Sequence, residues 1–167
     1  MKKRFSTNFT SYGGYGWAGA TPPELSRRLK AAIPAFERLR YDLNFDAVAF
    51  TGSSGACIAF VLAYETNIPL LYVRKPREKS HGNNLESNLR TSIKKYLIVD
   101  DFIDSGDTVR NMVKRINRAC TAKSMNPPEP VGVFLFDTTA FIPPRVRLDD
   151  ETFLDCWSPD SFDSPRG

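Results

Sequence analysis

The sequence predicts an α/β protein whose helices cover both faces of a parallel sheet. Between residues 46 and 137, short apolar runs of strand character alternate with segments of helical periodicity, a pattern typical of parallel sheets. The run at 96–99 is apolar at every position, as expected of a strand buried on both faces. Since such sheets bind ligands at the carboxyl ends of their strands, we expect functional residues just after Thr51, Val73 and Val99.

Each element follows from a local signal. Thr21 and Glu24 have the spacing of a capping box, and Pro22 suits the first position of a helix, so a helix should begin there. Pro34 should kink or split this helix, because its ring clashes with the preceding turn. Apolar content and periodicity predict strands at 46–51, 69–73, 96–99 and 131–136, and helices at 55–66 and 107–120.

The composition is that of one globular domain. The 167 residues are 41% hydrophobic and 25% charged, which excludes a wholly disordered chain. No apolar run reaches the roughly 18 residues of a membrane span, and the polar start at 1–6 lacks the apolar core of a signal peptide. The three cysteines share no short spacing, so neither a disulfide framework nor a zinc cluster is indicated. We therefore expect a cytoplasmic protein.

The charge distribution indicates an anionic partner. The net charge is +4, but residues 149–167 hold six acids against Arg166, which is −5 and leaves +9 on residues 1–148. Basic residues also dominate 74–95, which is long enough for a functional loop. A basic body of this kind is suited to nucleic acid or to a phosphorylated small molecule, and charge alone does not choose between them.

The segment 96–108 carries the chemistry. A buried strand ends in two acids, Asp100 and Asp101, and a turn that contains Gly106 then opens a helix. Consecutive amides from Ser105 to Thr108 lie at the positive end of that helix and form an anion site. Adjacent acids beside such a site repel each other and the anion, unless ribose hydroxyls and a divalent cation offset the repulsion. The segment is therefore suited to a ribose that carries phosphate and pyrophosphate.

At every position, residues 96–108 resemble the 13-residue signature of the type I phosphoribosyltransferases. The resemblance implies an α/β fold with a Rossmann-like parallel sheet flanked by helices and a small variable hood. It implies a single domain at 1–167, with a core at about 46–137 and a hood from 1–20 and 138–167. The expected activity is Mg²⁺-dependent transfer of 5-phosphoribose from phosphoribosyl pyrophosphate (PRPP) to a nucleobase nitrogen, with release of pyrophosphate.

The resemblance also assigns roles residue by residue. Asp100 and Asp101 are expected to hold the ribose and, mostly through substrate and water, Mg²⁺. The remaining PRPP-binding residues are expected to be Asp104, Ser105, Gly106, Asp107 and Thr108 around the 5-phosphate, and Thr51, Gly52, Ser53, Ser54, Gly55, Arg74 and Lys75 around the pyrophosphate. The expected catalytic residues are Lys79 and His81, which assist pyrophosphate departure, and Asp104, which acts as general base or orients the acceptor.

The acceptor base stays open between an orotate-like and a purine-like nucleobase. Asp104 matches the acid that 6-oxopurine members place near the incoming nitrogen, whereas the basic loop resembles that of orotate members. Asp137, Phe153 and Trp157 are weaker candidates for contact with the base. In orotate-type relatives the loop reaches into a neighbouring subunit, so the resemblance implies a homodimer.

A different class of function is a regulatory protein of the same fold that senses PRPP without catalysis and binds nucleic acid through the basic body. No helix-turn-helix or other nucleic-acid motif is recognisable, and the loop residues favour catalysis, so nucleic acid is not expected as a partner. A dinucleotide-binding protein is a third reading. The chain lacks the glycine pattern that such proteins carry after their first strand.

Overall fold

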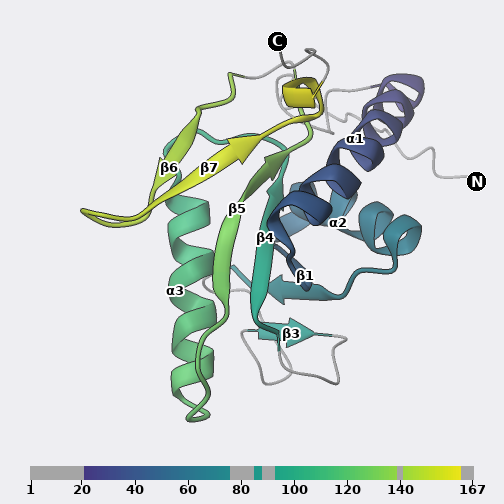
Figure 1. Ribbon diagram of the computed structural model, residues 1–167. Coiled ribbons are helices and arrows are strands. Elements are labelled where there is room, and N and C mark those ends of the chain that lie inside the picture. Colours follow the sequence, from purple (N-terminus) through teal and green to yellow (C-terminus); the bar gives the residue numbers. More distant parts are fainter. Residues whose placement is uncertain (1–20, 76–84, 88–92, 139–140, 163–167) are drawn as a thin grey trace, which may run out of the picture.

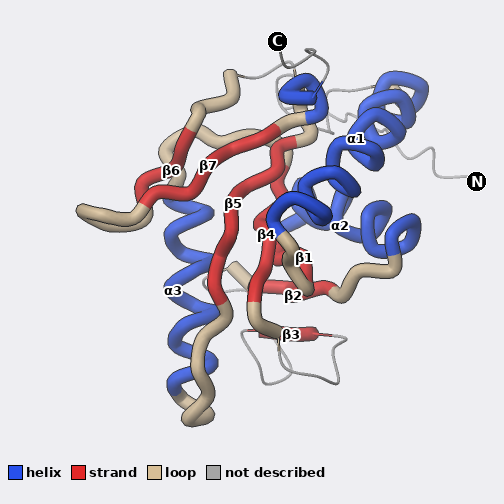
Figure 2. The backbone as a smooth tube through the Cα atoms, viewed as in Figure 1, coloured by secondary structure: helices blue, strands red, loops and turns tan. Residues whose placement is uncertain are grey.

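The computed structural model describes residues 21–75, 85–87, 93–138 and 141–162. The helices are α1 (Pro22–Leu43), α2 (Gly52–Thr66), α3 (Asp107–Thr121) and a short 3-10 helix, η2 (Pro159–Phe162). The strands are β1 (Ala47–Phe50), β2 (Leu70–Val73), β3 (Leu85–Ser87), β4 (Lys95–Asp100), β5 (Glu129–Leu135), β6 (Arg145–Arg147) and β7 (Phe153–Trp157). Figure 2 shows how these helices and strands follow one another along the backbone.

The seven strands form one sheet in the order β3-β2-β1-β4-β5-β7-β6. The five inner strands are parallel, so the predicted α/β fold with a parallel sheet is confirmed. The two edge strands, β3 and β6, pair antiparallel to their neighbours. Neither edge strand was predicted, because three residues are too few to show a periodic pattern.

Helices cover both faces of the sheet. In Figure 1, α1 and α2 lie on one side and α3 lies on the other. Each side has its own apolar core, one built around Phe36, Ile58 and Leu97 and the other around Met112, Ile116 and Ile98. Leu97 and Ile98 thus face opposite cores, which accounts for the uninterrupted apolar run in β4. No helix in the described part of the chain has the length and hydropathy needed to cross a membrane.

Helix α1 begins as predicted. The Glu24 carboxylate accepts hydrogen bonds from the Thr21 backbone N–H at 2.8 Å and from its hydroxyl at 2.6 Å. The helix continues through Pro34 without a break, so Pro34 does not split it. Ala35 and Phe36, which follow directly, are buried in the core. Packing of this apolar face therefore outweighs the backbone hydrogen bond that Pro34 cannot make.

One predicted boundary differs from the structure, and one region contains strands that were not predicted. Helix α2 begins at Gly52, three residues before the predicted start, so most of the expected pyrophosphate loop is the first turn of a helix. In the region assigned to a hood at 138–167, the described residues include β7, which pairs parallel with β5 and extends the central sheet. Leu154 and Val146 of this strand pair are buried in the core. Strands β6 and β7 of this region are thus part of the sheet, and the assignment of a hood stays a prediction.

Candidate functional site

A cavity of about 260 Å³ lies at the carboxyl ends of β1, β2 and β4. This is the edge of the sheet at which functional residues were expected. The cavity is lined by Thr51, Ser54, Lys75, Asp100, Asp101, Phe102, Ile103, Asp104, Ser105, Gly106, Asp107, Thr108 and Val109. The structure therefore brings together ten residues predicted to form the site, from three separate strand ends.

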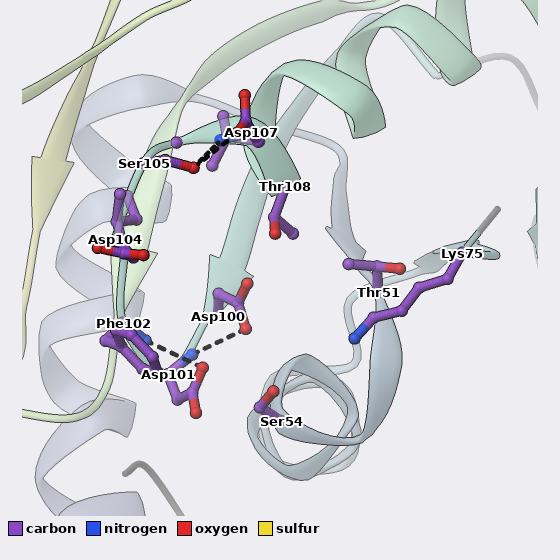
Figure 3. Close-up of a pocket in the computed structure, with 13 residues that line it drawn as sticks. Thr51, Ser54, Lys75, Asp100, Asp101, Phe102, Asp104, Ser105, Asp107 and Thr108 are labelled. Atoms are coloured by element: carbon purple, nitrogen blue, oxygen red, sulfur yellow. Dashed lines mark hydrogen bonds between the residues drawn. The ribbon is translucent and has the colours of Figure 1, made fainter.

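Two buried acids form the floor of the cavity. Asp100 and Asp101 are each 7% exposed, and backbone hydrogen bonds hold both side chains. The Asp100 carboxylate accepts from the Asp101 N–H, and the Asp101 carboxylate accepts from the Phe102 N–H, each at 3.0 Å (Figure 3). Their carbonyl oxygens accept the N–H groups of Phe136 and Asp137 after β5. Because the sheet fixes both the backbone and the side chains, the carboxylates are pre-organised for a ligand.

Burial changes the protonation of this pair. Removal from water raises the pKa of Asp100 to about 8, and the neighbouring charge of Asp101 adds to the effect. The Lys75 ammonium acts in the opposite direction. In Figure 3, Lys75 extends from the end of β2 toward Thr51 and Ser54, on the side of the cavity opposite Asp104. Burial thus favours the protonated form of Asp100, and a cation bound beside it would promote its ionisation.

The predicted anion site is a tight turn at the start of α3. Gly106 has a φ of 74°, in the left-handed region that favours glycine. The Ser105 hydroxyl donates to the Asp107 carboxylate at 2.8 Å and accepts from the Asp107 N–H at 3.2 Å. Arg110 donates to the Ser105 carbonyl at 2.6 Å and to the Asp107 carboxylate at 2.8 Å. These contacts lower the pKa of Asp107, and the hydrogen bond from Arg110 has the largest effect.

Arg110 is a site residue that the sequence reasoning missed. It braces the turn at Ser105 and Asp107, and it also donates to the Arg147 carbonyl of β6 at 3.0 Å. The sequence did contain a signal for this contact. Arg110 follows Asp107 by three residues, and oppositely charged residues at that spacing lie on one face of a helix and can form an ion pair. Because Arg110 compensates the Asp107 charge, the turn can present its backbone N–H groups to an anion.

Thr51, Ser54 and Lys75 form the opposite wall of the cavity. A Cβ atom at Gly52 would lie 2.7 Å from Lys75 Cε, so the absence of a side chain there lets Lys75 cross the start of α2. A Cβ atom at Gly55 would lie 3.1 Å from the Val99 carbonyl, so Gly55 permits close packing of α2 on the sheet. Gly52, Ser53 and Gly55 do not line the cavity. Their predicted contact with pyrophosphate stays a prediction, and the two glycines have clear packing roles.

Three further predicted residues lie apart from this wall or outside the described residues. Lys79 and His81 belong to 76–84, which the structure does not describe. Arg74 pairs with Glu86 of β3 at 2.6 Å, and its guanidinium lies 5.2 Å from the centre of the Tyr72 ring. Arg74 lines a neighbouring cavity rather than this one. Asp104, in contrast, is exposed and lines the main cavity.

The residues proposed to contact the base are placed elsewhere. Asp137 is 2% exposed and accepts a hydrogen bond from Arg28 of α1 at 2.9 Å, so its carboxylate already has a cationic partner. The Trp157 ring covers Gly132, where a Cβ atom would lie 2.1 Å from it, and so packs within the sheet. Phe153 begins β7, well before the carboxyl edge of the sheet. None of the three lines the cavity, and their contact with a base stays a prediction.

The fold and the cavity define an α/β protein with a buried acid pair and a glycine-containing turn at the carboxyl edge of its sheet. No family model matches the chain. The structure of orotate phosphoribosyltransferase from Aeropyrum pernix is similar, with a TM-score of 0.50 and 21% identity over 69% of this chain and 59% of that one. The fold is therefore that of the type I phosphoribosyltransferases.

Sequence comparison identifies two kinds of relative. Orotate phosphoribosyltransferase of Coxiella burnetii is 37% identical over 81 residues, which are 46% of this chain and 38% of that protein. A protein named transcriptional regulator GfcR, of Methanocaldococcus jannaschii, is 26% identical over 88 residues, 49% of this chain and 42% of that protein. The chain thus spans less than half the length of both curated relatives. The resemblance to the type I phosphoribosyltransferases is confirmed.

Proposed function

We propose that this chain transfers 5-phosphoribose from PRPP to a nucleobase nitrogen and releases pyrophosphate. The observation that carries the proposal is a single cavity in which a buried acid pair lies between an anion-binding turn and Lys75. A ribose with phosphate at one end and diphosphate at the other matches this order of groups. The similarity to orotate phosphoribosyltransferases supports the same activity.

In this proposal the cavity holds the sugar by its hydroxyls. The Asp101 carboxylate accepts from a ribose hydroxyl, and the buried Asp100 side chain provides a second partner. The backbone N–H groups of residues 105–108 bind the 5-phosphate, helped by the positive end of α3. Hydrogen bonds from Arg110 connect the turn to β6 and so help to hold its N–H groups in place for the phosphate. The substrate would therefore be bound with its anomeric carbon facing Thr51 and Lys75.

The reaction breaks the bond between the anomeric carbon and a pyrophosphate oxygen, and forms a bond from that carbon to a nitrogen of the base. Negative charge accumulates on the departing pyrophosphate, and the Lys75 ammonium lies where it would stabilise that charge. The proton lost by the base nitrogen passes to Asp104 or to water. Asp104 is exposed at the rim of the cavity, where an incoming base would meet it.

The acid pair is also suited to Mg²⁺. Among the described residues there is no group of three or more His, Cys, Asp or Glu side chains that would hold a metal alone. Mg²⁺ commonly binds through one or two carboxylates together with substrate phosphates and water. Asp100 and Asp101 supply two such carboxylates, so the residues present fit an ion shared with the substrate. When bound, Mg²⁺ would neutralise charge on the diphosphate.

The finer features remain part of the proposal. The acceptor is an orotate-like or purine-like base, and the protein acts as a cytoplasmic homodimer. With Asp137 paired to Arg28 and Trp157 packed in the sheet, Asp104 is the described residue best placed to select the acceptor.

The test is an assay of pyrophosphate release from PRPP and Mg²⁺ against a panel of nucleobases. The double substitution of Asp100→Asn and Asp101→Asn should reduce turnover at least about 100-fold, because it weakens two charge-assisted contacts of about 1.5–3 kcal/mol each. Asp42→Asn, an exposed acid of α1, is the matched control and should retain full activity. Unchanged turnover in the double variant would refute the assignment of the acid pair.

The second candidate is a regulator that binds PRPP without catalysis. The relative named as a transcriptional regulator favours it, because that protein resembles half of this chain. The same cavity would then bind PRPP as a signal. Calorimetric binding of PRPP by the wild-type protein, with no pyrophosphate released on any base, would favour the regulator over the enzyme.

A further inference from the structure

Helix α3 has one apolar face and one basic face. Its buried side chains, which pack in the core under the sheet, are Val109, Met112, Val113, Ile116 and Cys120. Lys114 and Arg118 lie on the opposite side of the helix, are both exposed, and are about 6 Å apart along its axis. Arg115 flanks them and is half-buried. Lys114, Arg115 and Arg118 together are named the α3 basic face.

No other described helix covers the α3 basic face. In Figure 1, α3 lies alone on its side of the sheet, whereas α1 and α2 share the other side. Among the described residues, the three side chains of the face form no hydrogen bond or ion pair. Arg110, earlier on the same helix, is engaged by Asp107, which is the one acid of α3. The cations of the face are therefore available to a ligand from solvent.

These cations repel one another in the free protein. Lys114 and Arg118 are four residues apart, and Arg115 and Arg118 are three apart, spacings at which like charges are unfavourable on a helix. Helix α1 differs, because acids are interspersed among its cations and Arg38 pairs with Asp42. Only Arg118 lies in the last turn of α3, where the helix dipole favours a cation. A ligand with several closely spaced negative charges would relieve the repulsion.

The side chains of the face favour a nucleic acid duplex over other polyanions. Two of the three cations are arginines, whose planar guanidinium can bind phosphate through two parallel hydrogen bonds. None of the large apolar side chains exposed in the described residues belongs to α3. An amphipathic helix on a membrane uses such side chains for insertion, and single-stranded nucleic acid is commonly bound by stacking on aromatic rings. A duplex needs neither, because dense phosphate charge dominates its binding.

We propose that the α3 basic face binds the phosphate backbone of a nucleic acid duplex, independently of base sequence. This inference goes beyond the proposed function and does not depend on it, since Lys114 and Arg118 line neither the main cavity nor its neighbour. Backbone contacts carry no sequence information, so they need none of the base-reading motifs that the sequence lacks. The excess of positive charge on residues 1–148 indicated an anionic partner, and the structure gathers part of that charge on one helix.

The test measures the affinity for a fluorescent DNA duplex of about 20 base pairs, by anisotropy, between about 50 and about 200 mM salt and without PRPP. One strand of that duplex and polyglutamate are compared as alternative polyanions. The variant is Lys114→Gln with Arg118→Gln. The matched control is Arg27→Gln with Lys30→Gln, which removes one arginine and one lysine from exposed positions of α1. Thermal unfolding of each protein checks that the fold is retained.

The affinity of the wild-type protein for the duplex should fall at least about 40-fold across this salt range, the effect of three phosphate contacts. The double variant should bind at least about tenfold more weakly at the lower salt and lose less of its affinity as salt is added, because two contacts are gone. The control should bind as the wild-type protein does.

Three kinds of result would overturn the inference. The first is the absence of duplex binding by the wild-type protein, or unchanged binding by the double variant. The second is equal weakening in the control, because total charge and not the α3 basic face would then govern binding. The third is tighter binding of the single strand or of polyglutamate than of the duplex, which would identify a different partner for this face.

Discussion

Neutralising the buried Asp100 should stabilise the protein while it abolishes activity. Burial raises the pKa of this carboxyl from 3.8 to about 8, so the native state retains a proton that the unfolded chain releases near pH 4. Stability therefore falls as the pH rises from about 4 to about 8, because over that range the unfolded state binds fewer protons than the native state. Asn has the same shape as Asp, and its side-chain oxygen can still accept the Asp101 N–H.

The expected gain in stability follows from the pKa shift of Asp100. Each unit of pKa change corresponds to about 1.4 kcal/mol. The rise in the pKa of Asp100 from 3.8 to about 8 therefore lowers the free energy of unfolding by at most about 5 kcal/mol at alkaline pH. Because Asp101 shares the burial and the charge, we expect Asp100→Asn to raise the free energy of unfolding by about 2–5 kcal/mol at pH 8.5 and by much less at pH 5.

The assay is urea unfolding of wild type and variant across this pH range. Asp104→Asn is the control, because it makes the same chemical change at an exposed position of the same cavity. A gain for Asp100→Asn that grows up to about pH 8 and then levels off would support the reasoning. A gain that is absent, or that is the same at every pH, would refute it, since only a native-state proton produces that dependence.

Two further predictions follow from contacts around the site. Arg28→Ala leaves the Asp137 carboxylate buried without its cation, so it should lower the free energy of unfolding by about 3 kcal/mol in urea titrations. Adding Asp137→Asn should recover part of this loss. Additive effects of the two substitutions on the free energy of unfolding would contradict the pairing. Gly106→Ala strains a residue at φ 74° and places its Cβ 3.0 Å from Val146 Cγ1, so calorimetry should show at least tenfold weaker binding of ribose 5-phosphate. Affinity equal to that of wild type would show that the turn does not bind the phosphate.

The acid pair and the turn were predictable because their signals are local. The apolar residues of β4, the two acids that end it and the glycine at the start of α3 are adjacent in the chain. The capping box of α1 is equally local and was confirmed. The start of α2 was predicted too late, because Gly52, Ser53 and Ser54 have low helix propensity. Packing of the rest of α2 on the sheet outweighs that preference.

Contacts between distant segments were beyond the sequence. Arg28 and Asp137 are 109 residues apart, so the sequence did not indicate that the Asp137 carboxylate has a cationic partner. The packing of the Trp157 ring over Gly132, 25 positions earlier in the chain, was likewise not indicated by the sequence. A side chain can contact many residues that are distant in the sequence. Hydrophobic periodicity reports local secondary structure and does not indicate which of these contacts forms.

By itself, the sequence determined a parallel α/β sheet, the strand that ends in Asp100 and Asp101, and the turn at Gly106, because chain connectivity alone holds those groups together. The tertiary structure decided that Lys75 passes close to Gly52 and lines the same cavity as the acid pair, and that Arg110 braces the turn. These arrangements depend on how α3 and the strand ends pack against one another. The physical reason is that burial and charge act through space, among groups that only the folded chain brings together.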